Sequence, residues 1–266
     1  MKKRIISLVL VLAMLLTLPL AAGALAPEDA ADRLHSLGLF QGVGNNEDGT
    51  PNFALENAPN RAQAIAMFVR LIGMAEYAND GEWETPFTDV PYWAEGYVGF
   101  AYEYGLTNGV SDTLFGSASR VSAAQYLTFI LRALDYVDGE DFEWDSAWEL
   151  ADEKGITDGQ FPGATQFLRG DVAWISFNAL SATFADSDEA LYEVLIYLGV
   201  FTAEQWEAAQ APKAPDNGED EKDEEDEDYD DEDEDEEDLD DEDEDEENEE
   251  DEDEDGEEEE DEEDAE

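Results

Sequence analysis

Apolar residues recur at helical spacing along most of the chain after residue 24, most clearly in residues 86–136. Two helical patterns there flank a short stretch bounded by Gly105 and Gly109. Apolar positions on one face are Trp93, Tyr97, Ala101 and Tyr104 in the first pattern, and Leu127, Ile130, Leu131 and Leu134 in the second. Because glycine accepts the positive φ that ends a helix, residues 86–136 are predicted to form a helical hairpin.

The same landmarks occur three times along the chain, which indicates internal repeats. Glycines four residues apart form the pairs Gly38 and Gly42, Gly105 and Gly109, and Gly155 and Gly159. A phenylalanine then precedes by eight residues a position near the start of the next helix; these phenylalanines are Phe53, Phe115 and Phe161. We therefore predict three repeats, at residues 25–75, 86–136 and 141–185, and the third is degenerate.

Two of the three second helices have a recognisable start. In a capping box, one side chain accepts a backbone N–H and another, three residues later, reaches back. The pairs with this spacing are Asn60 with Gln63 and Ser122 with Gln125. The third repeat has Leu168 at the capping position and Asp171 three residues later. Its helix is predicted to start more weakly, although Asp171 complements the helix dipole.

These residues resemble the S-layer homology family over about residues 26–184. The matching stretches of the middle repeat are Phe87-Thr88-Asp89-Val90, Trp93-Ala94, Tyr97-Val98, Gly105-Leu106-Thr107-Asn108-Gly109-Val110 and Phe115-Gly116. Asn60-Arg61-Ala62-Gln63 is similar to the family's Thr-Arg-Ala-Glu signature, and Leu168-Arg169-Gly170-Asp171 is a looser version. The resemblance implies an all-α fold of three helical hairpins around a pseudo-threefold axis. It also implies grooves between repeats that bind secondary cell-wall polymers, often through a pyruvylated sugar.

Arg61 and Arg169 are therefore the predicted ligand-binding residues, and Arg61 is the stronger candidate. An arginine in the first helical turn lies beside unpaired backbone N–H groups, and together they would form an anion site. The middle repeat has Ala123 at this position and Arg120 three residues earlier, so either Arg120 serves the same groove or that groove does not bind. The alternative for Arg61 and Arg169 is a surface charge or an ion pair with an acidic neighbour.

Asp89 and Trp93 are interpreted as structural residues. An aspartate just before a helix that begins with proline is usually a cap, and a tryptophan in the first turn is usually part of the core. Trp83 and Trp144 lie in connecting segments, where their rings can be exposed.

The two ends of the chain differ from the repeats. Residues 1–24 have the pattern of a signal peptide, with cleavage after Ala24 or Ala26 and no membrane span thereafter; the alternative is an uncleaved membrane anchor. Residues 187–210 are predicted to form a C-terminal helical hairpin that packs on the third repeat. Residues 211–266 form a linker and an acidic tail, predicted to be disordered because such charge density prevents collapse. The tail either binds Ca²⁺ diffusely or acts as a solvating brush.

The inventory of side chains limits the possible chemistry. The chain has no cysteine and one histidine, His35, which excludes most nucleophilic triads and transition-metal sites. We expect no cofactor and no specific metal site. The formal net charge of −62 disfavours nucleic acid and anionic lipid as partners.

Three functions remain from the sequence. The leading prediction is a secreted, non-catalytic module of the bacterial cell wall or S-layer that binds a wall polysaccharide or peptidoglycan. The second is a surface protein whose acidic tail is the active part. The third, a carboxylate-based glycan hydrolase, is weakly supported because no pair of carboxylates stands out among the many acids.

Overall fold

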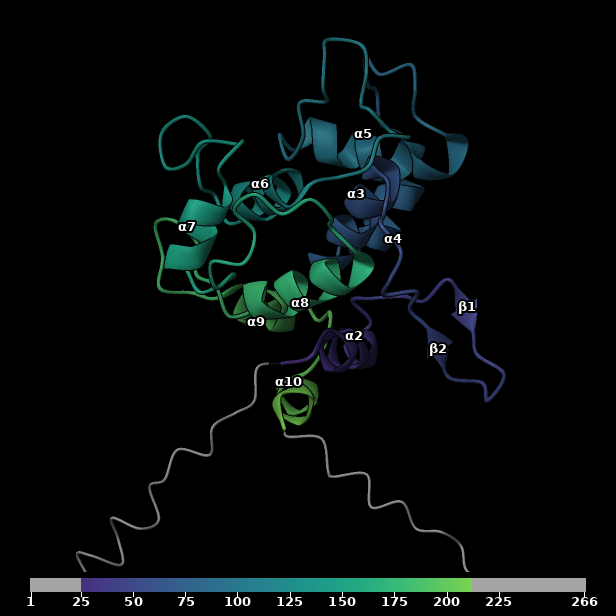
Figure 1. Ribbon diagram of the computed structural model, residues 1–266, viewed down its shortest axis with the longest axis vertical. Helices are drawn as coiled ribbons and strands as arrows, with labels where there is room; N and C mark the ends of the chain where they lie inside the picture. The colour runs from purple at the N-terminus through teal and green to yellow at the C-terminus, as the bar shows by residue number, and fades with distance from the viewer. Residues whose placement is uncertain (1–24, 212–266) are drawn as a thin grey trace, which may run out of the picture. The chain divides into compact units, whose positions relative to one another are not determined.

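The computed structural model describes residues 25–211 (Figure 1). The predicted signal peptide at residues 1–24 and the predicted linker and tail beyond residue 211 lie outside the described residues. The described part is mostly helical, as predicted, with one small antiparallel pair, β1 (Gly44–Asn45) and β2 (Pro51–Asn52), in the first repeat. No helix within residues 25–211 is both long and apolar enough to cross a membrane.

Each predicted repeat contains a first and a second helix. The first helices are α2 (Pro27–Ser36), α5 (Glu95–Glu103) and α7 (Trp148–Glu153). The second helices are α3 (Arg61–Leu71), α6 (Ala123–Ala133) and α8 (Arg169–Ala179). Two shorter elements lie between α3 and α5: α4 (Ala75–Asp80), which follows α3, and η1 (Tyr92–Ala94), which directly precedes α5 within the second repeat.

The helices pair between repeats instead of forming the predicted hairpins within them. Helix α5 packs on α3 as well as on α4, α7 packs on α6, and α2 packs on α8, so each first helix contacts the second helix of the preceding repeat in cyclic order (Figure 1). The long connections between the two helices of one repeat let the chain cross to this partner. The helix faces were predictable, but the partner that covers each face was not. The pseudo-threefold axis itself stays a prediction.

The second helices form the centre of the core, because they are buried on several sides. Most residues of α3 and α6 are buried, and the buried apolar residues of all three repeats join into one cluster. An apolar helix of this kind must be covered by more than one neighbour. The pairing between repeats therefore makes each repeat depend on the next for its burial.

The predicted starts of the second helices are confirmed. Both halves of the capping boxes are present, with Asn60 Oδ1 and Ser122 Oγ accepting the backbone N–H of the glutamine three residues later. At α8 only one half exists: the Leu168 N–H donates to Asp171 Oδ2 at 2.7 Å. Burial raises the pKa of Asp171, and the nearby Glu56 adds to the shift.

The predicted helix cap at Asp89 is wrong. Helix η1 begins without a side-chain cap, and the Asp89 carboxylate instead accepts the backbone N–H groups of Phe115, Gly116 and Ser117 at 2.7, 2.8 and 3.0 Å. Burial acts to raise the pKa of Asp89, but the three hydrogen bonds outweigh it and the pKa is lowered. Asp89 thus fixes the loop that precedes α6.

The predicted C-terminal hairpin appears as α9 (Leu191–Tyr197) and α10 (Ala203–Gln210). The capping box of Thr202 and Gln205 is present. Helix α10 packs on α2, so the extension covers the first repeat as well as the third. Trp206 joins these parts, because its ring lies 4.7 Å from that of Tyr192 and 5.9 Å from that of Phe177 on α8.

Candidate functional site

Arg61 and Arg169 begin α3 and α8, as predicted, and both side chains are buried. Their exposed fractions are 6% and 8%. An arginine is rarely buried to this extent without partners that compensate for its lost hydration. The two positions are equivalent in the repeats, but their surroundings differ.

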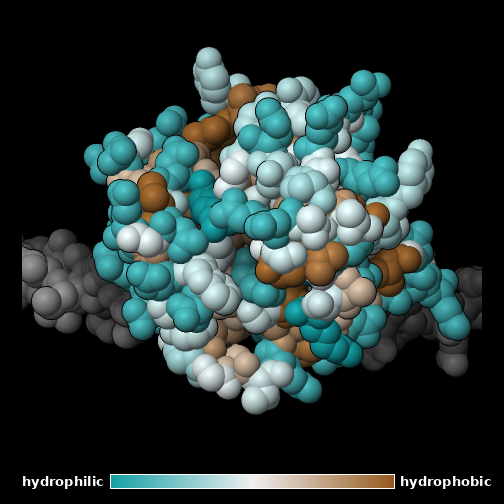
Figure 2. All heavy atoms as spheres, turned by 90° about the horizontal axis from the view of Figure 1, so that it is seen from above, coloured by the Kyte–Doolittle hydropathy of each residue, from teal (hydrophilic) through white to brown (hydrophobic). Residues whose placement is uncertain are grey.

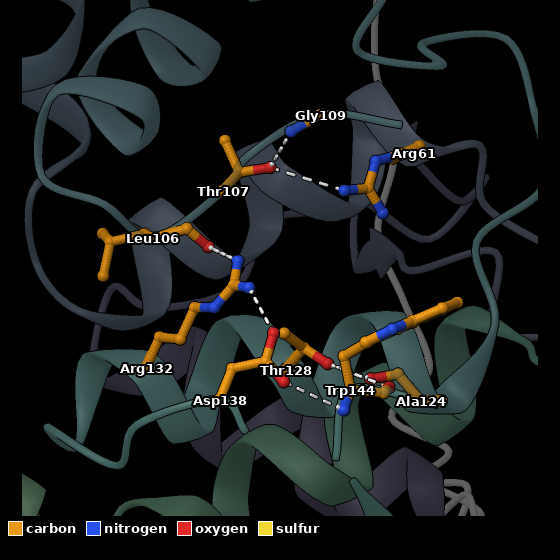
Figure 3. Close-up of polar contacts among 9 residues, drawn as sticks. All are labelled: Arg61, Leu106, Thr107, Gly109, Ala124, Thr128, Arg132, Asp138 and Trp144. Carbon is orange, nitrogen blue, oxygen red and sulfur yellow. Dashed lines mark hydrogen bonds and ion pairs between the residues drawn. The ribbon is translucent and has the colours of Figure 1, made fainter. Parts of the chain in front are cut away.

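Arg61 points into a cavity of about 310 Å³ between the first and second repeats, here called the Arg61 cavity. Its walls come from the glycine loop after α5, from α6 and from the connection to the third repeat. The polar and aromatic residues of these walls are Asn108, Gln125, Thr128, Phe129, Arg132, Asp138 and Trp144. Figure 3 shows the Arg61 and Arg132 guanidiniums extending into the same space from opposite sides.

The Arg61 guanidinium has few hydrogen bonds to the protein. One nitrogen donates to Thr107 Oγ1 at 3.4 Å, and Nε is buried without a partner among the described residues. The cation is held mainly by the rings of Phe115 and Phe129, whose centroids lie 4.9 Å from Cζ. Burial and then the charge of Arg132 lower the pKa of Arg61 to about 10, so it remains charged at neutral pH. Arg61 is therefore a positioned cation with free donors.

Arg132 and Asp138 form an ion pair in the wall of the Arg61 cavity. Arg132 donates to Asp138 Oδ2 at 2.9 Å, and Asp138 Oδ1 accepts the backbone N–H of Trp144 at 3.2 Å (Figure 3). Thr128 also donates to the Trp144 carbonyl at 3.3 Å. The Trp144 side chain is 53% exposed, as its position in a connecting segment suggested. The cavity thus combines two cations, one carboxylate and an accessible aromatic ring.

Arg169 differs because its donors are occupied by the first repeat. Nε donates to the Phe53 carbonyl at 2.7 Å, and one terminal nitrogen donates to the Gln41 carbonyl at 2.9 Å. The other terminal nitrogen lies 3.2 Å from Met67 Sδ. Burial and then the charge of Arg70 lower the pKa of Arg169. These bonds make Arg169 a tie between the third and first repeats.

Arg169 nevertheless borders a second cavity of about 230 Å³, here called the Arg169 cavity. Arg70 and Tyr97 line it with Trp93, and Arg70 donates to the Tyr97 hydroxyl at 3.3 Å. The prediction that Trp93 belongs to the core is wrong, since its side chain is 50% exposed. Trp93 lies in η1, a single turn at the edge of α5, where only Ala94 turns inward.

The third junction, between the second and third repeats, lacks both arginines. Ala123 begins α6, and Asn178 stands at the α8 position that Arg70 and Arg132 hold in α3 and α6. Asn178 donates to the Ile156 carbonyl at 3.3 Å. Arg120 does not restore the charge here: it is exposed and lines another cavity of about 440 Å³, with Glu56, Asn57 and residues 165–168.

The backbone N–H groups at the helix starts do not take part in an anion site. The N–H of Arg61 donates to the Ser119 carbonyl at 2.8 Å, and that of Ala62 donates to the Ser117 carbonyl at 3.2 Å. The N–H of Arg169 likewise donates to the Asn57 carbonyl at 2.9 Å. This part of the prediction is wrong, because loops from neighbouring repeats occupy the donors. Only the guanidiniums remain to meet a ligand.

Arg70 and Arg132 were not predicted as site residues, although the sequence contains a signal for them. Each stands nine residues after the first residue of its helix, or about two and a half turns. Arg61 and Arg70 therefore leave opposite faces of α3 and enter different cavities. The helix starts alone do not reveal the second cation of each cavity, because it lies near the other end of the neighbouring helix.

These cations are concentrated on an otherwise acidic surface. Residues 25–211 contain seven arginine and lysine residues against 31 acidic residues. Four of the seven, Arg61, Arg132, Arg70 and Arg169, line the two cavities. The face in Figure 2 is mostly hydrophilic, with hydrophobic residues in small separate groups. The two cavities are thus local positive sites.

Comparison with known proteins identifies the family of the middle repeat. The model of the S-layer homology domain matches residues 86–122. The "Cell surface protein" of Thermoanaerobacter kivui is 33% identical over 177 residues, which cover 63% of this chain and 22% of that protein. The "Middle cell wall protein" of Brevibacillus brevis is 29% identical over 203 residues, which cover 70% of this chain and 19% of that protein. The "Surface layer protein" of Brevibacillus choshinensis is 30% identical over 149 residues, which cover 53% of this chain and 13% of that protein.

The chain spans about a fifth or less of the length of these relatives. The similarity therefore concerns one region of each relative. Together with the domain match at residues 86–122, it supports a location at the cell wall or S-layer. Residues 86–122 thus match the S-layer homology domain, and the chain is similar to proteins named for the cell surface, the cell wall and the surface layer.

Proposed function

We propose that the chain anchors itself to the cell envelope, without catalysis, by binding an anionic wall polysaccharide in the Arg61 cavity. The observation that carries this proposal is the Arg61 guanidinium, which is buried, charged and left with an unpartnered Nε beside a second cation. Burying a cation with unused donors costs stability, and a ligand that accepts those donors would compensate for it. The S-layer homology domain supports the anchoring role.

The chemistry of the cavity favours an acidic sugar. A carboxylate can accept hydrogen bonds from a guanidinium, and charged bonds of this kind are stronger than neutral ones. Trp144 offers an exposed ring against which the apolar face of a sugar can pack. Asn108 and Gln125 add amide groups that can donate to or accept from hydroxyls. Arg61 and Arg132 would bind the carboxylate of the sugar, and Trp144 would pack against the sugar ring.

The arrangement does not favour glycoside hydrolysis. Hydrolysis of this kind uses two carboxyl groups on either side of the bond that breaks. Among the residues lining the Arg61 cavity, Asp138 is the one carboxylate, and it is ion-paired with Arg132. We therefore assign binding, and not cleavage, to this cavity.

The test compares the retention of purified protein on cell-wall sacculi for the parent and for Arg61→Ala. We expect Arg61→Ala to weaken retention about tenfold, the loss that corresponds to one charged hydrogen-bonding partner. Arg120→Ala is the matched control, because it removes the same charge from an exposed residue outside the cavity. Equal retention of the parent and Arg61→Ala would remove Arg61 from the mechanism.

A second experiment identifies the polymer. Retention is measured on sacculi before and after chemical removal of the secondary polysaccharide. Loss of retention after this treatment would assign the ligand to the secondary polysaccharide. Unchanged retention would assign the ligand to peptidoglycan. If that retention still depended on Arg61, the binding site would remain the Arg61 cavity.

A further inference from the structure

The Arg61 cavity contains a carboxylate that the proposed binding of an anion does not explain. Asp138 faces the same space as Arg61 and Arg132, and an anion entering this space approaches it (Figure 3). Like charges at short range repel each other, and they do so more strongly in a partly buried cavity than in water. A carboxylate here weakens the binding of any anion. Its presence is explained if it discriminates between anionic ligands.

We propose that Asp138 determines specificity by restricting the Arg61 cavity to ligands that carry a single negative charge. This inference rests on the proposed function of the same cavity. Arg61 and Arg132 supply two positive charges, and Asp138 neutralises one of them at 2.9 Å. One ligand carboxylate then balances the remaining charge. A second negative charge would stand beside Asp138 without a free cation.

Asp138 is held in place and does not turn away from the cavity. One of its oxygens accepts from Arg132 and the other accepts the Trp144 N–H. The loop that carries it is closed by hydrogen bonds from the Val137 N–H to Asp141 Oδ2 at 2.7 Å and from the Gly139 N–H to the Phe142 carbonyl at 2.8 Å. Because both oxygens are occupied, the negative charge keeps a fixed position.

The Arg169 cavity shows that this position in the repeat does not require a carboxylate. Arg70 is the equivalent of Arg132, and its partner is the Tyr97 hydroxyl, which is neutral. No acidic residue is among those that line the Arg169 cavity in the described part of the chain. The carboxylate is therefore a feature of the Arg61 cavity and not a general requirement for holding an arginine there.

The experiment measures the affinity of three sugars for the full-length protein at pH 8 by calorimetry. N-acetylmuramic acid carries one negative charge, N-acetylglucosamine 6-phosphate carries about two, since its second pKa is about 6, and N-acetylglucosamine carries none. The variants are Asp138→Asn, which keeps the shape, Asp138→Glu, which keeps the charge, and Asp145→Asn, which removes a charge from an exposed neighbour outside the cavity.

The parent is expected to prefer N-acetylmuramic acid to the phosphate sugar by about tenfold, and Asp138→Asn to lose that preference. Asp138→Glu and Asp145→Asn are expected to keep it, which a purely structural role of Asp138 would not produce. An unchanged preference in Asp138→Asn would overturn this inference while leaving Arg61-dependent retention on sacculi intact. If none of the sugars binds and retention is also independent of Arg61, the proposed function fails together with this inference.

Discussion

Arg61 and Arg169 hold the same position in their helices, yet their guanidiniums have different partners. Arg169 makes two hydrogen bonds to carbonyls of the first repeat at 2.7 and 2.9 Å, whereas the one hydrogen bond of the Arg61 guanidinium measures 3.4 Å. Both lose hydration on burial, which lowers the pKa of each. Arg169 compensates for that loss with these hydrogen bonds, whereas Arg61 is held mainly by the rings of Phe115 and Phe129. We therefore assign Arg169 to the stability of the fold, and this leaves Arg61 for the ligand contact proposed above.

Replacing each arginine by methionine separates these roles. Arg169→Met leaves the carbonyls of Phe53 and Gln41 without their donor, and we expect it to lower the free energy of unfolding by about 2–4 kcal/mol. Arg61→Met removes a poorly compensated buried cation, so we expect a change within about 1 kcal/mol. Urea unfolding followed by tryptophan fluorescence measures both. Equal losses for the two variants would contradict the assignment.

Asp89 gives a pH dependence whose sign follows from its lowered pKa. A carboxyl group with a lower pKa in the folded state stabilises the protein above its unfolded pKa of about 4, and this contribution is lost as the pH falls through the folded value. We expect Asp89→Asn to cost about 1–2 kcal/mol at pH 7 and much less near pH 3. Thermal unfolding from pH 7 to pH 3 measures the difference. The exposed Asp112→Asn is the control, and a difference from the parent that stays constant with pH would exclude this role.

The helices show what local sequence determines and what it leaves open. The starts of α3 and α6 follow from side chains three residues apart, and a single sequence reveals such pairs. The partner of each helix depends on contacts between residues far apart in the chain, such as those of α2 with α8. An apolar face predicts that a helix is buried on that side, but it does not identify the helix that packs against it. For the same reason the positions of Arg61 and Arg169 were predictable, but the loops that close their backbone donors and the cavities shared with Arg70 and Arg132 were not.

In the glycine loop after α5, a side chain at Gly105 would strain only the backbone, whereas one at Gly109 would also collide with neighbouring atoms. Gly105 and Gly109 both have positive φ, at 69° and 71°. A Cβ at Gly105 meets no atom within 4 Å, whereas one at Gly109 would collide with the Phe87 ring and lie 2.7 Å from the Leu114 carbonyl oxygen. We expect Gly105→Ala to cost about 1 kcal/mol and Gly109→Ala about 3 kcal/mol or more, measured by urea unfolding. Similar costs would show that the loop adjusts to the added carbon.

Charge is distributed unevenly over the whole chain. Of the 74 acidic residues, 43 lie from Asp216 onward, and the formal net charge of the chain is −62. The described residues are acidic too, apart from the two cavities that collect four arginines. The net charge of the chain would repel an anionic polymer at long range, whereas the binding proposed for the Arg61 cavity would act at short range. Salt weakens the long-range term first, because screening acts most on distant, exposed charges.

We therefore expect retention on sacculi to pass through a maximum as salt increases. The screening length falls from about 30 Å at 0.01 M to about 8 Å at 0.15 M, which removes most of the repulsion. Higher salt then weakens the contact between Arg61 and the ligand anion as well. Deleting residues 216–266 removes most of the acidic charge, so the truncated protein should bind better at low salt and show a smaller rise. Retention that falls steadily from 0.01 M in both proteins would show that the net charge of the chain does not influence binding.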